Sequence, residues 1–513
     1  MKKGWIGVAL FLLTFCSLFL SVEGIGITWD EPIYINYILY QSKWLLSPHP
    51  FSRDAILRFW PAQAHPPFVQ YLLSPSILLL SRFFDPLTSA RIGTIIISSL
   101  LIVAIFWIVS QFYGKIVGLF CSLSLLFIPR LWGHFHLVSL DVPLMLIVLL
   151  ASYSFMRGIN SWRWSIISGI LWGFALSTKA TSLLFIPPLL IWAHIYHRKE
   201  YGNNVISLFF ISPAIFFILW PGMWIETAKH FLQFVSFQVI RMTIPVYYFG
   251  TTFTEGMPTP WHYPLLMFAV TIPVSTLIFI FIGTGRLIKE KFQDEFGALC
   301  FILSVFFLLG VCSPFYSKYD GIRLFIAVLP FLVCLGGKGL SWIQQKIEKS
   351  LPARKKAFIF YTILFISIFP GLLDIIRTHP FYLAHYNILI GGIKGAQNRG
   401  METTYWGDTI NNRVIQFINK KVKVGAKVGI YPVGSLQTKY LQAFMRDDIT
   451  LDSSYSAETD YLILHCRQGM FKEELWNIYN SAKPIFVQSV NSVPLVKVYE
   501  KDEILPFLSR KSD

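Results

Sequence analysis

The stretch WIGVALFLLTFCSLFLSV, residues 5–22, is an apolar run that leads into the polar sequence GITWDEPIYINY, residues 26–37. A run of this length is sufficient for one membrane-spanning helix. Lys2 and Lys3 precede it, as in a signal peptide, but the apolar core is long and no small-residue cleavage motif follows it. We therefore interpret residues 5–22 as an uncleaved first span, with two adjacent acids, Asp30 and Glu31, shortly after its end.

Similar apolar runs recur along most of the chain and define its class. Of 513 residues, 54% are hydrophobic and only 14% are charged, whereas soluble domains carry about 25% charged residues. These values predict an all-α polytopic membrane bundle of about eleven transmembrane helices. The expected spans are residues 5–22, 92–112, 116–131, 138–156, 164–178, 182–196, 205–220, 263–283, 297–312, 322–338 and 357–373.

A shorter apolar run, residues 68–81, contains Gln70 and Pro75 and is expected to be a juxtamembrane helix. Omitting it from the spans places the basic loops on one side, which agrees with the positive-inside rule if the N-terminus is cytoplasmic. This clustering accounts for the formal net charge of +16 and argues against a nucleic-acid partner. The basic loops hold Lys115, Arg157, Arg163, Arg198, Lys199, Arg286, Lys289, Lys291, Lys338, Lys346, Lys349, Arg354, Lys355 and Lys356.

The same topology predicts two domains. Residues 1–374 form the transmembrane domain, whose outer loop 23–91 is long enough to carry a functional site. Residues 375–513 form an extracytoplasmic segment with a small α/β domain. Its expected strands are KVGIYPV, from Lys427, and DYLILHC, from Asp460, and its expected helices are residues 412–421 and 471–480.

Three acids are candidate functional residues. A carboxylate next to hydrocarbon is costly to bury, so Asp30 and Glu31 are candidates for taking a proton from a hydroxyl group. The alternative is that they only cap the helix that follows. Asp141, in SLDVPLMLI, has the same alternative as a helix N-cap. The topology places all three acids on the outer face, which suggests one shared pocket.

Cations also lie on this outer face, where the positive-inside rule does not require them. Lys179 is in a short turn, Arg323 starts a span, and Arg58 and His65 lie in the first outer loop. They either bind lipid headgroups or neutralise a phosphate leaving group.

Aromatic residues accompany these charges. Trp29 and Tyr34 flank the acid pair, and Tyr319 precedes Arg323. The loop YYFGTTFTEGMPTPWHYPL, residues 247–265, contains Trp261 and His262. It is either an interfacial aromatic belt or one wall of a sugar pocket, where we also place Trp29, Tyr34 and Tyr319.

Metal ligation has little support in the sequence. His134 and His136, together with Asp141, are a possible ligand set of low specificity. The six cysteines show no CxxC pair and no His/Cys ligand spacing, so neither a disulfide framework nor a zinc site is expected.

Several stretches in order resemble the GT-C glycosyltransferases that use polyprenyl-phosphate sugars. The likeness is to glycosyltransferase family 39, which includes the protein O-mannosyltransferases and aminoarabinose transferases. The chain lacks room, outside its tail, for the β-trefoil insert of the eukaryotic protein O-mannosyltransferases. The matching stretches are TWDEPIYINY, AHPPFVQYL, SLDVPLMLI, GFALSTKATSLLFIPPLL, WPGMW, PTPWHYPL, YDGIRLFIAVLPFL and HPFYLAHYNILIGGIKGAQNRGMETTYWGDT.

The resemblance implies a multi-span bundle with juxtamembrane helices in the first outer loop, and a function. The chain is expected to be an inverting glycosyltransferase that moves a sugar from a polyprenyl-phosphate or dolichyl-phosphate donor to an acceptor hydroxyl. Asp30 matches the catalytic base, Glu31 and Asp141 would orient the acceptor or tune the base, and HPP begins at His65. Lys179 and Arg323, with Arg58 and His65, would stabilise the departing phosphate.

The acceptor stays open among protein, glycolipid and cell-wall glycan, and the need for a metal is undetermined. The expected location is the plasma (inner) membrane, multi-pass, with active site and C-terminus extracytoplasmic. One alternative function is a transporter or flippase of lipid-linked sugars, although no inverted repeat is visible in the sequence. Another is a membrane assembly factor with a degenerate site.

Overall fold

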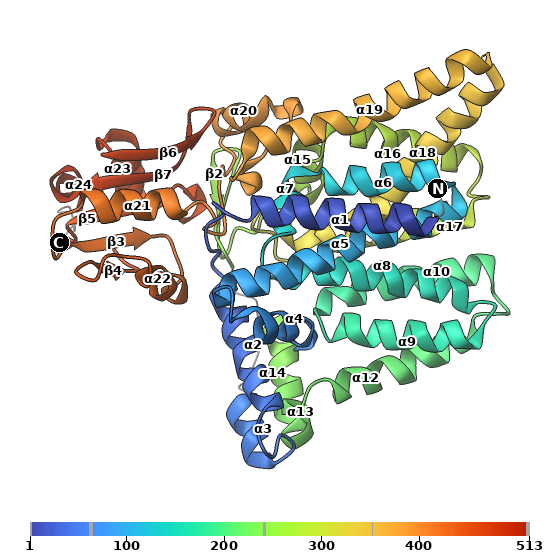
Figure 1. Cartoon of the computed structure of the whole chain (residues 1–513), viewed down its shortest axis with the longest axis horizontal. Coiled ribbons are helices and arrows are strands. Elements are labelled where there is room, and N and C mark those ends of the chain that lie inside the picture. Colours follow the sequence, from blue (N-terminus) through green and yellow to red (C-terminus); the bar gives the residue numbers. More distant parts are fainter. Residues whose placement is uncertain (1–2, 61–64, 240–242, 351, 509–513) are drawn as a thin grey trace.

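The computed structural model describes residues 3–60, 65–239, 243–350 and 352–508. It shows a helical bundle with a small sheet region at one end (Figure 1). The bundle helices are α1 (Lys3–Ser21), α5 (Pro86–Phe112), α6 (Lys115–Leu126), α8 (Asp141–Gly158), α9 (Trp162–Leu176), α10 (Ile186–Tyr196), α11 (Gly202–Ile206), α12 (Ser212–Ile218), α15 (Tyr263–Thr271), α16 (Val274–Lys289), α17 (Glu295–Cys312), α18 (Leu329–Ser350) and α19 (Ala353–Thr378).

The predicted count of eleven spans is not confirmed. Within the described ranges, six helices are long and apolar enough to cross a membrane, or seven if α15 and α16, bent by 119°, form one span. The shortfall arises where proline or a short turn breaks the apolar run, as Pro129 does after α6 and Pro273 does between α15 and α16. A 12-residue helix such as α6 is only about 18 Å long. The six helices are Gly4–Ser21, Pro86–Phe112, Asp141–Gly158, Glu295–Cys312, Arg323–Ser350 and Lys355–Thr378.

Short helices of the loops 23–91 and 221–262 form an arm that projects beside the bundle (Figure 1). The run expected to be juxtamembrane is α4, a 13-residue helix that packs against α2 and α5. At 1.5 Å per residue it is too short to cross a bilayer once, which fits the sequence-based expectation. The arm consists of α2 (Glu31–Leu45), α3 (Arg53–Phe59), α4 (Phe68–Leu80), α13 (Gly222–Ile225) and α14 (Thr227–Val239).

After α19 the chain forms the C-terminal region, residues 379–508, which contains the strands and helices predicted at 412–421, 427 onward, 460 onward and 471–480. Its five-stranded sheet has the order β4-β3-β5-β7-β6, with β3 parallel to β4 and β5, and β7 antiparallel to β5 and β6. Its elements are α20 (Gly392–Asn398), α21 (Asn412–Lys421), β3 (Lys427–Tyr431), α22 (Ser435–Gln442), β4 (Thr450–Asp452), β5 (Tyr461–His465), the 3-10 turn η6 (Gln468–Met470), α23 (Glu473–Ser481), β6 (Phe486–Val490), β7 (Val493–Glu500) and α24 (Lys501–Leu508).

Helices cover both faces of this sheet. Ile463 of β5 packs with residues of α21, whereas its neighbours Leu462 and Leu464 pack with residues of α23 and α24. This division follows from the alternation of side chains along a strand. The C-terminal region also contacts the hairpin formed by β1 (Val246–Tyr248) and β2 (Thr251–Phe253), because Glu402 N donates to Tyr247 O at 3.1 Å.

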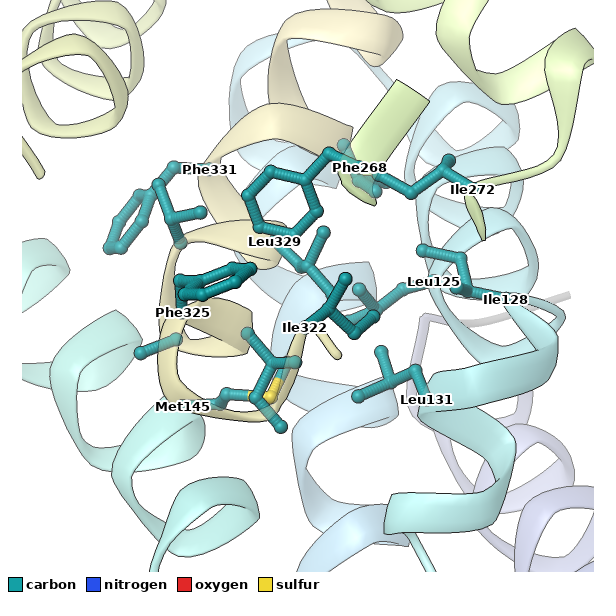
Figure 2. Close-up of a cluster of buried hydrophobic side chains, with 14 of the residues drawn as sticks. Leu125, Ile128, Leu131, Met145, Phe268, Ile272, Ile322, Phe325, Leu329 and Phe331 are labelled. Atoms are coloured by element: carbon teal, nitrogen blue, oxygen red, sulfur yellow. The ribbon is translucent and has the colours of Figure 1, made fainter. Parts of the chain in front are cut away.

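A buried apolar cluster lies where helices of the bundle meet (Figure 2). Ile322, just before the 3-10 turn η3 (Arg323–Val328) that leads into α18, and Phe325, within that turn, are fully buried in this cluster. Their packing fixes the backbone that carries Arg323. The labelled members are Leu125, Ile128, Leu131, Met145, Phe268, Ile272, Ile322, Phe325, Leu329 and Phe331.

Helices α16 and α18 approach closely through glycines. A Cβ atom on Gly283 would lie 1.8 Å from Leu335 O, and one on Gly339 would lie 2.5 Å from Phe279 O. Small residues at such positions let membrane helices pack backbone to backbone.

We expect Gly283→Leu to destabilise the protein, because the side chain must push α16 away from α18. Overpacking of this kind typically costs about 1–3 kcal/mol. The measurement is the midpoint of thermal unfolding in detergent. Gly285→Leu is the matched control, because it adds the same side chain to the same helix at a position with nothing within 4 Å. Equal midpoints for the two variants would contradict the close contact.

Candidate functional site

The centre of the site is the guanidinium group of Arg323, which bridges three carboxylates. Its Nη2 donates to Asp30 Oδ2, its Nη1 donates to Asp320 Oδ2 at 2.8 Å, and its Nε lies 3.4 Å from Asp141 Oδ2. The Arg323 side chain is only 9% exposed. The structure therefore brings together Asp30, Asp141 and Arg323, which lie far apart in the sequence and were expected on one face.

Lys179 completes the cation set on the other side of Asp141. Its Nζ donates to Asp141 Oδ1 at 2.6 Å, and both side chains are buried. Asp141 is the first residue of α8, whose N-cap is Leu140. Its carboxylate binds Lys179 and Arg323, so the capping alternative does not describe what this side chain does. Asp30, by contrast, is the N-cap residue of α2, but its side chain makes no cap bond.

Trp406, from the C-terminal region, covers the same guanidinium group. The Arg323 Cζ atom lies 3.9 Å from the centre of the Trp406 ring, and Trp406 Nε1 donates to Asp30 Oδ2 at 3.0 Å. Trp406 has a φ of 63°, in the left-handed region that tryptophan rarely adopts. Such strain is found mainly at functional sites. Sequence reasoning missed Trp406, although the stretch TTYWGDT belongs to the resemblance.

Asp320 and Arg467 were also missed. Arg467 Nη2 donates to Asp320 Oδ1 at 2.8 Å, and both side chains are 2% exposed. Glu402 Oε1 lies 3.8 Å from Arg467 Nε. The only signal in the sequence was the position of Asp320, three residues before Arg323. With Asp30, Asp141, Lys179, Arg323, Asp320 and Arg467, the cluster contains equal numbers of acids and cations.

Glu31 points away from this cluster. It is fully buried, and its carboxylate accepts hydrogen bonds from Arg91 Nε and Nη2 at 2.9 and 2.7 Å, and from the amides of Thr28 and Val138. Arg91 also donates to Ile25 O at 2.9 Å. Glu31 therefore holds the backbone before α2 onto α5. The structure gives its carboxylate structural partners rather than the place beside Asp30 that the sequence suggested.

The predicted aromatic set divides into two groups. Tyr34 is buried next to the charges of Asp30 and Arg323, and burial raises the pKa of its hydroxyl well above the usual value. Trp29 lies against Arg467, whose Cζ is 5.7 Å from its ring centre.

The second group lies in the loop 247–265. Trp261 is 63% exposed, while His262 Nδ1 lies 2.9 Å from the Tyr248 hydroxyl oxygen. The exposure of Trp261 fits the interfacial belt better than the wall of a closed pocket. Tyr319 lies outside both groups: it is half-buried, one residue before Asp320.

Arg58 and His65 belong to the arm. Arg58 is exposed on α3, a helix that lies far along the arm (Figure 1), and it does not belong to the ion pairs of Asp30, Asp141 or Asp320. The His65 ring packs edge-on against Phe237 of α14, with ring centres 5.4 Å apart. The structure thus places neither residue beside the guanidinium group of Arg323.

The possible metal ligands are not assembled. Among the described residues, no three His, Cys, Asp or Glu side chains are arranged to hold a metal ion. The His134 ring packs against Trp406 with 5.5 Å between centres, and His136 Nδ1 lies 2.8 Å from Trp132 O. The possible ligand set of His134, His136 and Asp141 is therefore not formed, because Lys179 and Arg323 occupy the carboxylate.

Comparison with known proteins gives a family match that covers part of the chain. Residues 64–224, less than half of the chain, match the model of the dolichyl-phosphate-mannose-protein mannosyltransferase family. This match confirms the resemblance inferred from the motifs. The chain is similar to the GT-C glycosyltransferases. A comparison with curated protein sequences gives no match.

Two solved structures share the fold. ArnT from Cupriavidus metallidurans in the apo state is 13% identical, with a TM-score of 0.51, over 97% of this chain and 98% of that chain. The oligosaccharyltransferase from Archaeoglobus fulgidus, tethered to an acceptor peptide, is 12% identical, with a TM-score of 0.51, over 90% of this chain and 65% of that chain. At such identities the likeness is one of fold.

The pKa of Glu402 provides a test of how deeply this carboxylate, which lies beside Arg467, is buried. Burial raises the pKa of Glu402 from 4.5 to about 7, so the folded state binds its proton more tightly than the unfolded state does. Its stabilising contribution is present below pH 4.5 and is lost as the pH rises through about 7. We expect Glu402→Gln, which mimics the protonated form, to show a smaller fall in unfolding midpoint between about pH 5 and 8 than the wild type.

The expected difference follows from about 1.4 kcal/mol for each unit of pKa shift. Thermal unfolding across the pH range measures it. Glu458→Gln is the control. Glu458 is an exposed acid of the same region, and its ion pair is with Lys427. A pH dependence of Glu402→Gln that equals that of the wild type would refute the raised pKa.

Proposed function

We propose that this chain is a membrane glycosyltransferase that moves a sugar from a polyprenyl-phosphate or dolichyl-phosphate donor to an acceptor hydroxyl, with inversion. The observation that carries the proposal is the ion-paired cluster of Asp30, Asp141, Lys179 and Arg323. The cluster lies at the end of the bundle that faces the C-terminal region. The family model that matches residues 64–224 supports the lipid-phosphate donor class.

Asp30 is the base in this proposal. Its side chain is 25% exposed, whereas those of Asp141 and Asp320 are 4% and 2% exposed. Of these three acids it is therefore the one that an acceptor hydroxyl can reach. Glu31 is excluded from the same task by its four structural hydrogen bonds.

The reaction balances with one proton transfer. The acceptor oxygen forms a bond to the anomeric carbon from the side opposite the phosphate, and its proton moves to Asp30. The bond between that carbon and the phosphate oxygen breaks, and both electrons go to the oxygen. The leaving polyprenyl phosphate gains a negative charge, which nearby cations stabilise.

Lys179 and Arg323 are the cations placed for that charge. A guanidinium group can bind two oxygens of a phosphate in parallel, as it does with carboxylates. A donor phosphate competes with Asp30 for Arg323, so binding of the donor releases the Asp30 carboxylate to act as a base. Asp141 keeps Lys179 and Arg323 in place. Arg58 and His65 keep only a role in guiding the lipid headgroup, because they lie in the arm.

The remaining details of the proposal rest on the sequence. The acceptor is a protein, a glycolipid or a cell-wall glycan, and the sugar is undefined. The proposed location is the plasma (inner) membrane, with the cluster and the C-terminal region on the extracytoplasmic side, as the basic loops indicate.

We expect Asp30→Asn to reduce transfer by a factor of about 10²–10⁴, because the amide cannot accept the proton. A panel of radiolabelled polyprenyl-phosphate sugars serves as donors, and membranes from cells lacking this chain serve as acceptors. Label in the acceptor fraction is the measurement. Asp54→Asn is the matched control, because Asp54 is an exposed acid in the first turn of α3 of the same loop.

Transfer by Asp30→Asn at the wild-type rate would exclude Asp30 as the base. If the wild type transfers no sugar but moves a labelled polyprenyl-phosphate sugar across vesicle membranes, the flippase alternative replaces this proposal. Mass spectrometry of glycolipids and glycoproteins from the same cells identifies the acceptor class.

A further inference from the structure

The C-terminal region reaches the cluster through one ion pair. Arg467 follows β5, and it donates to Asp320 Oδ1 at 2.8 Å while Arg323 donates to Asp320 Oδ2 at 2.8 Å. Asp320 therefore bridges two guanidinium groups, one from the C-terminal region and one from the membrane bundle. All three side chains are buried, so the pairs are little screened by water.

The turn that carries Asp320 is held in an uncommon conformation. Asp320 has a φ of 55° and Gly321 a φ of 62°, both in the left-handed region. A Cβ on Gly321 would lie 2.4 Å from Arg130 Nη1 and 2.8 Å from Tyr405 Cε1. The turn is packed against these side chains, so Asp320 is presented to Arg323 in one orientation. A non-glycine residue in this region costs free energy that the surrounding packing has to supply.

The same region also holds the segment before Asp30. Trp29 N donates to Trp406 O at 2.8 Å, and Gly26 N donates to Asp408 O at 2.9 Å. These bonds, together with the bond from Trp406 Nε1, attach the Asp30 loop to the C-terminal region. Both members of the Asp30–Arg323 pair thus depend on residues beyond the last helix of the bundle.

We propose that Asp320 and Arg467 are positioning residues that set where the Arg323 guanidinium lies between Asp30 and the donor phosphate. This inference rests on the proposed function. Both side chains are only 2% exposed, so in this proposal they act through Arg323 and not directly on donor or acceptor. Arg467 fixes Asp320, and Asp320 fixes the Nη1 edge of Arg323, which leaves the Nη2 edge for Asp30 or for a phosphate oxygen. The C-terminal region then completes the catalytic geometry.

A purely structural role is the competing explanation, in which the pair only attaches the C-terminal region to the bundle. The two explanations differ in their effect on kinetics. A positioning pair affects the turnover number of correctly folded protein, because a displacement of about 1 Å at a reacting group can cost about 10²-fold in rate. A structural pair affects the amount of folded protein and leaves the turnover number of the folded fraction unchanged.

The test uses the full-length protein and the polyprenyl-phosphate sugar that the wild type transfers in the panel described above. For Asp320→Asn and Arg467→Gln, we expect kcat per folded molecule to fall by about tenfold to a hundredfold, with the donor KM within about twofold. Because both act on Arg323 through one contact, the double variant should be no more than about twofold worse than the worse single variant. Arg467→Lys, which keeps the charge, should recover part of kcat.

Lys427→Gln is the matched control, because it removes an exposed ion pair with Glu458 in the same region. Binding of unglycosylated polyprenyl phosphate and thermal unfolding are measured for every variant. If Arg467→Gln does not fold because buried Asp320 loses one of its two cationic partners, the double variant decides, since removing both partners of a buried pair is often tolerated. A wild-type kcat in Arg467→Gln or in the folded double variant overturns the inference. The inference is also overturned if the losses in kcat of the two single variants multiply in the double variant.

The outcome is separable from that of the proposed function. If Asp30→Asn abolishes transfer and the Asp320 and Arg467 variants behave like Lys427→Gln, only the positioning inference fails. If Asp30→Asn retains transfer, the assignment of the base fails, whatever the Arg467 variants do.

Discussion

The site depends on one buried guanidinium group that has to be neutralised. Removing the charge of Arg323 from water costs several kcal/mol unless it is paired, and three carboxylates from three parts of the chain supply the pairing. Asp30 comes from the segment between α1 and α2, Asp141 from the start of α8, and Asp320 from the turn before η3. The requirement to satisfy one cation therefore fixes the relative positions of three segments that the bundle alone would only bring near one another.

The C-terminal region is part of this arrangement rather than an appendage. Trp406 stacks on Arg323 and donates to Asp30, and Arg467 pairs with Asp320. Backbone bonds from the Asp30 loop to residues 406 and 408 strengthen the connection. Val490, Val493 and Leu495 of the sheet belong to the same buried apolar cluster as residues of the bundle helices, so apolar packing joins the two parts as well as these polar contacts.

Much of the fold and part of the site could be predicted from the sequence. Long apolar runs predicted the helices, and the basic loops placed Asp30, Asp141, Lys179 and Arg323 at one end, where the structure joins them. Helix counting was less successful, because Pro129, Pro273 and short turns divide apolar runs that composition alone treats as continuous. Trp406 and Arg467 were not predicted, since a tryptophan and an arginine in an α/β region have no periodicity that reveals a partner in another domain.

The sequence by itself determined that this chain is a membrane protein, which of its loops gather at one end, and which acids and cations are candidates. Hydropathy and charge asymmetry carry that information locally, along the chain. Only the tertiary structure showed which of Asp30 and Glu31 lies beside Arg323. Consecutive residues at the start of a helix point about 100° apart, so one acid faces Arg323 and the other faces Arg91. The cation that each acid meets depends on how α5, which carries Arg91, and η3, which carries Arg323, pack in the folded chain. A local sequence pattern cannot encode that packing.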